Sequence, residues 1–139
     1  MLARSEAYDS PRLYSLDRIK NVELTKKKLD LPEGFNAHDF FAKYYGIIVD
    51  NDPNLKAFTV ELRVASDQVK YFESLPLHAS QTKVQEDEDY TIFQYHLVPT
   101  FDFKQEILSR GPSVKVLAPE WFVDEMKSDI QEMAKMYAE

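Results

Sequence analysis

The chain has 139 residues, 44% of them hydrophobic and only three of them glycine, so it can bury the core of one ordinary domain or of a small domain with an added segment. It has no cysteine, which excludes disulfides, thiolate metal sites and thiol catalysis, and it has no apolar run long enough to cross a membrane. Residues 1–11 contain no apolar signal region, so we expect a cytoplasmic protein.

Charge is distributed unevenly along the chain. Residues 1–28 carry seven basic and four acidic side chains, whereas the remaining residues carry 10 basic and 20 acidic ones, a net charge of −10. Such an acidic body repels a phosphate backbone, so we expect any contact with nucleic acid at the N-terminal segment. A solubilising surface is the more ordinary explanation for most of the acidic groups.

The first predicted element is a β-hairpin over residues 2–25, with a turn within residues 6–11. Tyr14, Leu16 and Arg18 alternate with their neighbours and would share one face of the second strand. One hairpin cannot bury a core by itself. We therefore expect this segment to be part of a larger sheet, and the chain to begin inside a domain.

A short helix is predicted over residues 36–45. Asn36 is a good N-cap, and Phe35 and Phe40 have the spacing of a hydrophobic staple across the start of the helix. Gly46 is suited to the position just after the last turn.

From residue 56 onward the predicted order is β-α-β-β-α-β-α. The first six elements match the split β-α-β arrangement of ferredoxin-like domains, in which two helices cover one face of an antiparallel sheet. The predicted features are a strand over 58–64, a helix capped by Ser66, a polar strand over 81–85, a turn at 86–89, a strand over 90–98, a helix capped by Asp102, a strand over 114–117 and a final helix after Pro119.

The final helix carries an apolar stripe with helical spacing. Such a stripe serves either as core or as an anchor at a protein interface, and a helix that follows a complete ferredoxin-like unit is a plausible dimerisation element. The interface candidates are Trp121, Met126, Ile130, Met133 and Tyr137.

Two parts of the sequence resemble a known family. Residues 12–19, Arg-Leu-Tyr-Ser-Leu-Asp-Arg-Ile, resemble the segment that closes a WYL domain, although the Trp-Tyr-Leu motif itself is not in the chain. Residues 77–81, 90–99, 102–103, 106–109, 111 and 119–122 resemble the C-terminal extension of WYL-domain regulators, the WCX domain.

The resemblance implies a bacterial transcription regulator. Its relatives carry a DNA-binding helix-turn-helix, then a small Sm-like β-barrel that senses a nucleic-acid or nucleotide effector, and then a ferredoxin-like extension that helps to form a homodimer. By this analogy Arg12 and Arg18 occupy basic pocket positions of the barrel. This chain lacks the helix-turn-helix and most of the barrel, so only the full-length protein is expected to bind operator DNA.

The ligand-binding candidates are Arg4, Arg12, Tyr14 and Arg18. An arginine fork suits a phosphate, and a neighbouring aromatic ring can stack on a base. Arg18 is the strongest of these because it would share a buried-type face with Leu16. Alternatively, Arg18 pairs with an acid such as Asp17 and only fixes the hairpin.

No pattern in the sequence supports catalysis or a resident cofactor. His38, His78 and His96 lack the spacing of metal ligands, and the acidic run 86–89 lacks the glycine of a calcium loop. No glycine-rich phosphate loop or nucleophile elbow is present. We therefore predict a protein that is not an enzyme and that holds no metal or cofactor.

These observations define an α+β protein with three parts. Residues 1–30 would be the end of a WYL-like barrel, residues 31–54 a linking helix and linker, and residues 55–139 a ferredoxin-like WCX domain. The predicted function is the ligand-sensing and dimerisation portion of a transcription regulator. The alternative is a stand-alone ferredoxin-like module that binds a ligand or another protein.

Overall fold

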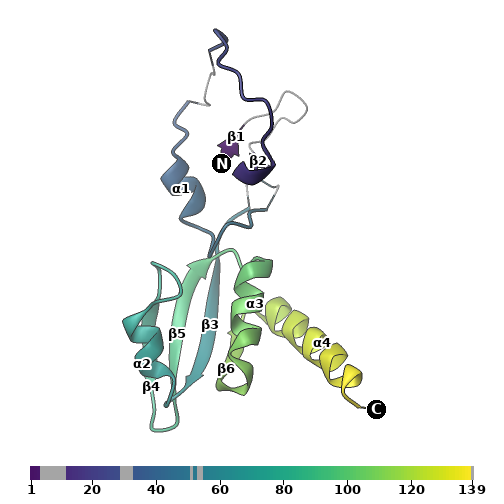
Figure 1. The fold of residues 1–139 in the computed structure, drawn as a ribbon. Coiled ribbons are helices and arrows are strands. Elements are labelled where there is room, and N and C mark those ends of the chain that lie inside the picture. The colour runs from purple at the N-terminus through teal and green to yellow at the C-terminus, as the bar shows by residue number, and fades with distance from the viewer. Residues whose placement is uncertain (4–11, 29–32, 51, 53–54, 139) are drawn as a thin grey trace.

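The structure is a computed structural model that describes residues 1–3, 12–28, 33–50, 52 and 55–138. It is an α+β structure in which a small two-stranded hairpin precedes a four-stranded antiparallel sheet with helices and a C-terminal helix (Figure 1). The elements are β1 (Leu2–Ala3), β2 (Arg12–Leu13), α1 (Ala37–Phe41), β3 (Phe58–Ala65), α2 (Val69–Ser74), β4 (Thr82–Glu86), β5 (Tyr90–Leu97), α3 (Phe101–Ser109), β6 (Val114–Ala118) and α4 (Glu120–Met136).

The sheet has the strand order β4-β5-β3-β6, and every neighbouring pair is antiparallel. The alternation predicted for β3 is confirmed, because Val60, Leu62 and Val64 are buried. Their partners in β5 and β6 point to the same side, as the pairs Leu62–Phe93 and Leu62–Val116 require. One face of the sheet is therefore apolar, while the other carries half-buried and exposed polar groups.

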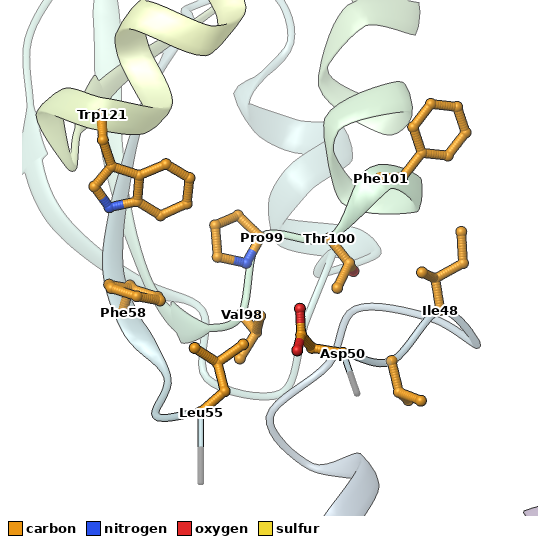
Figure 2. Close-up of a pocket in the computed structure, with 10 residues that line it drawn as sticks. Ile48, Asp50, Leu55, Phe58, Val98, Pro99, Thr100, Phe101 and Trp121 are labelled. Carbon is orange, nitrogen blue, oxygen red and sulfur yellow. The ribbon is translucent and has the colours of Figure 1, made fainter. Parts of the chain in front are cut away.

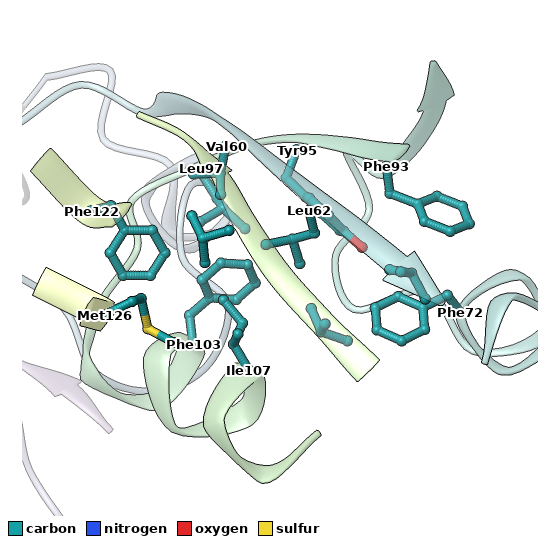
Figure 3. Packing of buried hydrophobic residues seen from close by; sticks show 13 residues of the cluster. Val60, Leu62, Phe72, Phe93, Tyr95, Leu97, Phe103, Ile107, Phe122 and Met126 are labelled. Carbon is teal, nitrogen blue, oxygen red and sulfur yellow. The ribbon is translucent and has the colours of Figure 1, made fainter. Parts of the chain in front are cut away.

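Aromatic side chains from the helices cover the apolar face (Figure 3). Phe72 of α2 stacks on Phe93 of β5 with ring centroids 5.8 Å apart, and Phe103 of α3 stacks on Phe122 of α4 at 6.3 Å. All four rings are almost fully buried. Each such side chain contributes about 1.5–3 kcal/mol through burial alone, so this cluster is what holds the helices on the sheet.

Two predicted helix caps are wrong, although both helices exist. Helix α2 begins after Gln68 rather than Ser66, whose N–H donates to the carbonyl of Asp89 at 3.0 Å and so still belongs to the end of the sheet. Helix α3 begins after Thr100, and Asp102 lies inside its first turn. The Asp102 carboxylate instead accepts a hydrogen bond from the Thr100 hydroxyl at 2.5 Å.

The predicted N-terminal hairpin is present, but it is much shorter than predicted. Within the described residues, pairing in this segment is limited to Leu2–Ala3 with Arg12–Leu13, and residues 6–11, where the turn was predicted, lie outside the described residues. Residues Leu16–Arg18 form a 3-10 turn, so Leu16 and Arg18 do not share a buried face; Leu16 is 68% exposed and Arg18 is exposed too. Alternation alone does not make a strand, because in the described residues no neighbouring strand continues alongside this segment.

The linking helix is shorter than predicted. The Asn36 side chain accepts from the His38 N–H at 2.9 Å, and the Phe35 and Phe40 rings lie 6.0 Å apart, so the cap and the staple are confirmed. However, α1 ends at Phe41, and Gly46 is not its C-terminal glycine. The chain leaves the helix because residues 43 and 44 are drawn into contact with the end of β5.

Candidate functional site

The ligand-binding residues predicted from the sequence lie in the N-terminal part of the chain. Arg12 is half-buried on β2, Tyr14 follows this strand, and Arg18 is exposed in the 3-10 turn. The backbone of Tyr14 exchanges two 2.8 Å hydrogen bonds with Met1, which extends the β1–β2 pairing by one step. Arg4 lies outside the described residues.

Helix α4 divides the predicted interface residues into two groups. Met126 is buried at 7% exposure, and the ring of Trp121 lies 5.3 Å from that of Phe58 on β3. Ile130, Met133 and Tyr137 are exposed because the second half of α4 extends away from the sheet (Figure 1). Trp121 is itself 45% exposed, so the stripe is core at Met126 and uncovered surface at its end.

Lys104 of α3 fixes the direction in which α4 leaves the body. Its ammonium group lies 2.6 Å from a Glu125 oxygen and 2.9 Å from an Asp129 oxygen, and its side chain is only 14% exposed. Hydrogen bonds to Asp129 and then to Glu125 raise the pKa of Lys104. The lysine therefore stays charged and holds the middle of α4 against α3.

Residues 42–50, which we call the junction segment, dock onto the end of the sheet. Tyr44 is buried and forms an isolated parallel bridge with Val98, just beyond β5. The Val98 N–H donates to the carbonyl of Lys43 at 2.7 Å, and the Lys43 ammonium donates to the carbonyl of Leu55 at 2.8 Å. The sequence predicted a linker here, whereas the structure has a packed joint.

The same segment also packs against the start of α3. The Tyr45 ring lies 5.4 Å from Phe103, and the N–H of Ile48 donates to Oδ2 of Asp102 at 3.2 Å. Burial, followed by the nearby Glu106 carboxylate, raises the pKa of Tyr45, so its hydroxyl stays protonated at neutral pH. These contacts make the junction segment part of the C-terminal domain surface.

A cavity of about 400 Å³ lies where the junction segment, β3, the end of β5 and the starts of α3 and α4 meet (Figure 2). Most of its described lining is apolar or aromatic, including Leu55, Phe58, Val98 and Trp121, and Asp50 is the one charged side chain in that part of the lining. Its size lies within the usual range for small-ligand sites. Sequence reasoning missed this cavity because its lining comes from five segments that only the fold brings together.

A second cavity, of about 250 Å³, lies at the opposite end of β3 and is lined partly by Arg63, Tyr90 and Lys115. The Arg63 guanidinium already lies over the Tyr90 ring, 5.5 Å from its centroid. Asp89 also lines this cavity, so its charge is mixed. We regard it as the weaker candidate of the two.

Neither the histidines nor the acidic run forms a recognisable metal centre. Within the described residues, no group of three or more His, Cys, Asp or Glu side chains is placed to hold a metal ion. Burial lowers the pKa of His78, although the carbonyls of Ala42 and Tyr44 favour its charged form. The Nδ1 atom of His78 accepts a hydrogen bond from the Ser80 N–H at 3.2 Å, as a neutral imidazole can. The neutral ring of His78 thus contacts the junction segment through the carbonyls of Ala42 and Tyr44.

No helix in the described part of the chain is long and apolar enough to span a membrane. Comparison with curated proteins gave no match. The family model of the WCX domain matches residues 56–134, and it therefore lends no support to the WYL resemblance of residues 12–19. WCX domains are typically the C-terminal extensions of WYL-domain bacterial transcription regulators, and they are not catalytic domains. Because the match spans more than half of the sequence, the chain belongs to the WCX domain family.

Proposed function

We propose that this chain is the ligand-sensing and dimerisation portion of a bacterial transcription regulator, and that a second copy packs on the exposed half of α4. The observation that carries the proposal is the change along this helix from Met126, 7% exposed, to Met136, 76% exposed. Exposed apolar side chains grouped on one element favour a protein partner over bare solvent. Ile130, Met133 and Tyr137 belong to the same uncovered stripe.

Charge favours a second copy at this place over other parts of the surface. The whole chain carries a net charge of −7, which makes two copies repel each other. Residues 127–136 of α4 carry Lys127, Asp129, Glu132 and Lys135, whose charges sum to zero. Each of these four side chains forms an ion pair within its own chain. The apolar stripe on α4 can therefore pack against the same stripe of a second copy without leaving one of these charges unpaired.

The domain arrangement of the proposal rests on topology and resemblance. The order β-α-β-β-α-β and the sheet order β4-β5-β3-β6 support a ferredoxin-like WCX domain over residues 55–139. The short β1–β2 pair is compatible with the end of a WYL-type barrel within residues 1–30. The packed junction segment would then connect the two parts within residues 31–54.

This arrangement suggests how a signal passes through the regulator. A nucleic-acid or nucleotide effector would bind the WYL part through Arg12 and Arg18, and it would favour one geometry of the two paired extensions. An effector can shift such an equilibrium only if it binds the two geometries with different affinity. The distance between two DNA-binding heads in the full-length dimer would change accordingly.

Sedimentation equilibrium of the whole chain tests the dimer. We expect a species of twice the 16.2 kDa chain mass, and we expect Ile130→Asp to shift it to monomer because two carboxylates would face each other across an apolar contact. Ser128→Asp, an exposed position on the same helix, is the matched control and should leave the dimer intact. A monomer at 100 µM (roughly the weak end of functional dimers), or a dimer unaffected by Ile130→Asp, contradicts the proposal.

Effector binding is tested on the full-length regulator. We expect Arg18→Gln to weaken binding of a labelled single-stranded oligonucleotide by about tenfold or more in fluorescence anisotropy, since one charge-assisted phosphate contact is lost. Lys20→Gln, an exposed basic residue two positions away, should have a smaller effect. An unchanged affinity and unchanged DNA release in Arg18→Gln would remove Arg18 from the effector site.

A further inference from the structure

The cavity at the junction segment is surrounded by large apolar side chains that remain partly exposed. Phe101 is 60% and Trp121 45% exposed, and the Trp121 ring meets Phe58 edge to face at 5.3 Å. Figure 2 shows Phe58 and Trp121 on one side and Ile48 and Phe101 on the other. Apolar groups gathered around a concave site, rather than scattered over the surface, are typical of ligand pockets.

The charge of this cavity restricts the ligand. Among the described residues that line it there is no Lys, Arg or His, and Asp50 is the one ionisable group. One oxygen of Asp50 accepts from the Asp52 N–H at 2.8 Å, and no basic side chain of the described residues forms an ion pair with this carboxylate. The Thr100 hydroxyl already donates to Asp102. A phosphate or a carboxylate would therefore meet only repulsion here, whereas a cation would be attracted.

We propose that this cavity binds a small organic ammonium compound, with its charged nitrogen on Asp50 and its apolar body against Phe58 and Trp121. An ammonium–carboxylate hydrogen bond is about twice as strong as a neutral one, and the aromatic faces of Phe58 and Trp121 offer apolar area to the body of the ligand. The ligand class is opposite in charge to the effector proposed for the N-terminal arginines. The two proposals therefore stand or fall separately.

Such a ligand would also strengthen the joint between the two parts of the chain. Asp50 and Ile48 belong to the junction segment, whereas Phe58 and Trp121 belong to β3 and α4 of the WCX domain. A molecule that contacts both sides binds only when the segment is docked, and binding therefore favours the docked state.

Trp121 is the only tryptophan in the sequence, so tryptophan emission reports on this cavity. We would titrate the whole chain with 2-phenylethylammonium chloride at pH 7 and low salt, and follow both Trp121 emission and calorimetric heat. We expect a saturable signal in both measurements, and affinity at least about tenfold above that for 2-phenylethanol or 3-phenylpropionate, because only the amine can pair with Asp50.

The Asp50→Asn variant should bind the amine and the alcohol with equal affinity, because its side chain is of similar size but uncharged. Asp87→Asn, an exposed carboxylate at the β4–β5 turn, is the matched control and should keep the preference for the amine. Far-UV circular dichroism would establish that both variants are folded. The proposal is overturned if neither measurement saturates up to about 10 mM amine, a ceiling set by the weakest useful sites, or if the alcohol or the acid binds as tightly as the amine. Retention of amine selectivity by Asp50→Asn would equally reject it.

Discussion

Gly46 and Asp102 lie so close together that a Cβ added to residue 46 would overlap the Asp102 carboxylate. The two residues come from the junction segment and from the first turn of α3, so their contact is one of the points at which the segment meets the domain. Oδ2 of the same carboxylate also accepts from the Ile48 N–H. A side chain larger than hydrogen at position 46 would push this acceptor away.

Gly46→Ala should therefore destabilise the chain by about 1–3 kcal/mol, the usual cost of inserting a methyl group into a packed site. Chemical denaturation of the whole chain measures this cost. The cost should be smaller in an Asp102→Ala background, where the overlapping group is gone, and the difference gives the coupling between the two residues. Equal costs in both backgrounds would contradict the described contact.

The two ends of α4 should respond differently to the same substitution. Met126→Ala removes a buried side chain and should cost about 2–5 kcal/mol, whereas Met136→Ala, near the exposed end, should change the free energy of unfolding of the monomer by less than about 0.5 kcal/mol. Thermal or urea unfolding at concentrations that keep the chain monomeric compares them directly. Similar costs for the two methionines would show that the second half of α4 is not uncovered.

Acid should lower the free energy of unfolding of the chain through protonation of His78. Burial lowers the pKa of His78 below its ordinary value of 6.5, so the unfolded chain binds this proton more readily than the folded one. The contribution of His78 to the free energy of unfolding is therefore complete above pH 6.5, and it is lost as the pH falls below 6.5. In urea titrations between pH 7.5 and 5, His78→Gln should reduce the loss, whereas His96→Gln, an exposed control, should not. An identical decline in His78→Gln and the unmodified chain would exclude this role.

Alkali should lower the free energy of unfolding through deprotonation of Tyr95. The Tyr95 hydroxyl donates a hydrogen bond to Oε1 of Gln81 at 2.9 Å in the core. Burial raises the pKa of Tyr95 above its ordinary value of 10.0, so stability is complete below pH 10 and falls above it as the unfolded chain releases the proton. Tyr95→Phe should cost about 0.5–1.5 kcal/mol at pH 7 for one hydrogen bond and should flatten the decline above pH 10. The exposed Tyr137→Phe serves as its control. A decline of unchanged slope in Tyr95→Phe would contradict the expectation.

The β-α-β-β-α-β order was predictable because β3, β5 and β6 alternate over a sheet that buries one face, whereas the edge strand β4 is exposed throughout. Val60, Leu62 and Val64 show this pattern in β3, and the sheet confirms it. The same pattern misled at Leu16, where the alternating residues form a 3-10 turn and no described strand lies alongside them. Periodicity reports which face a strand would bury, but it does not say whether a partner is present.

The candidate pocket was beyond the reach of sequence patterns for a different reason. Asp50, Phe58 and Trp121 lie 8 to 71 residues apart in the sequence, and only the docking of the junction segment brings them around one cavity. Trp121 was among the interface residues predicted from the sequence, but the other residues that line the cavity with it were not predicted. A motif search needs fixed spacing, which this site does not have.

The bridge between Tyr44 and Val98 lies beyond the last paired residue of β5, Leu97. The backbone N–H of Val98 is therefore protected by the junction segment and not by the sheet ladder. In hydrogen exchange, this amide should follow a local opening of lower free energy than the amides within β5, which require the sheet itself to open. The joint would then be a separate cooperative unit, able to release the N-terminal part while the domain keeps its shape.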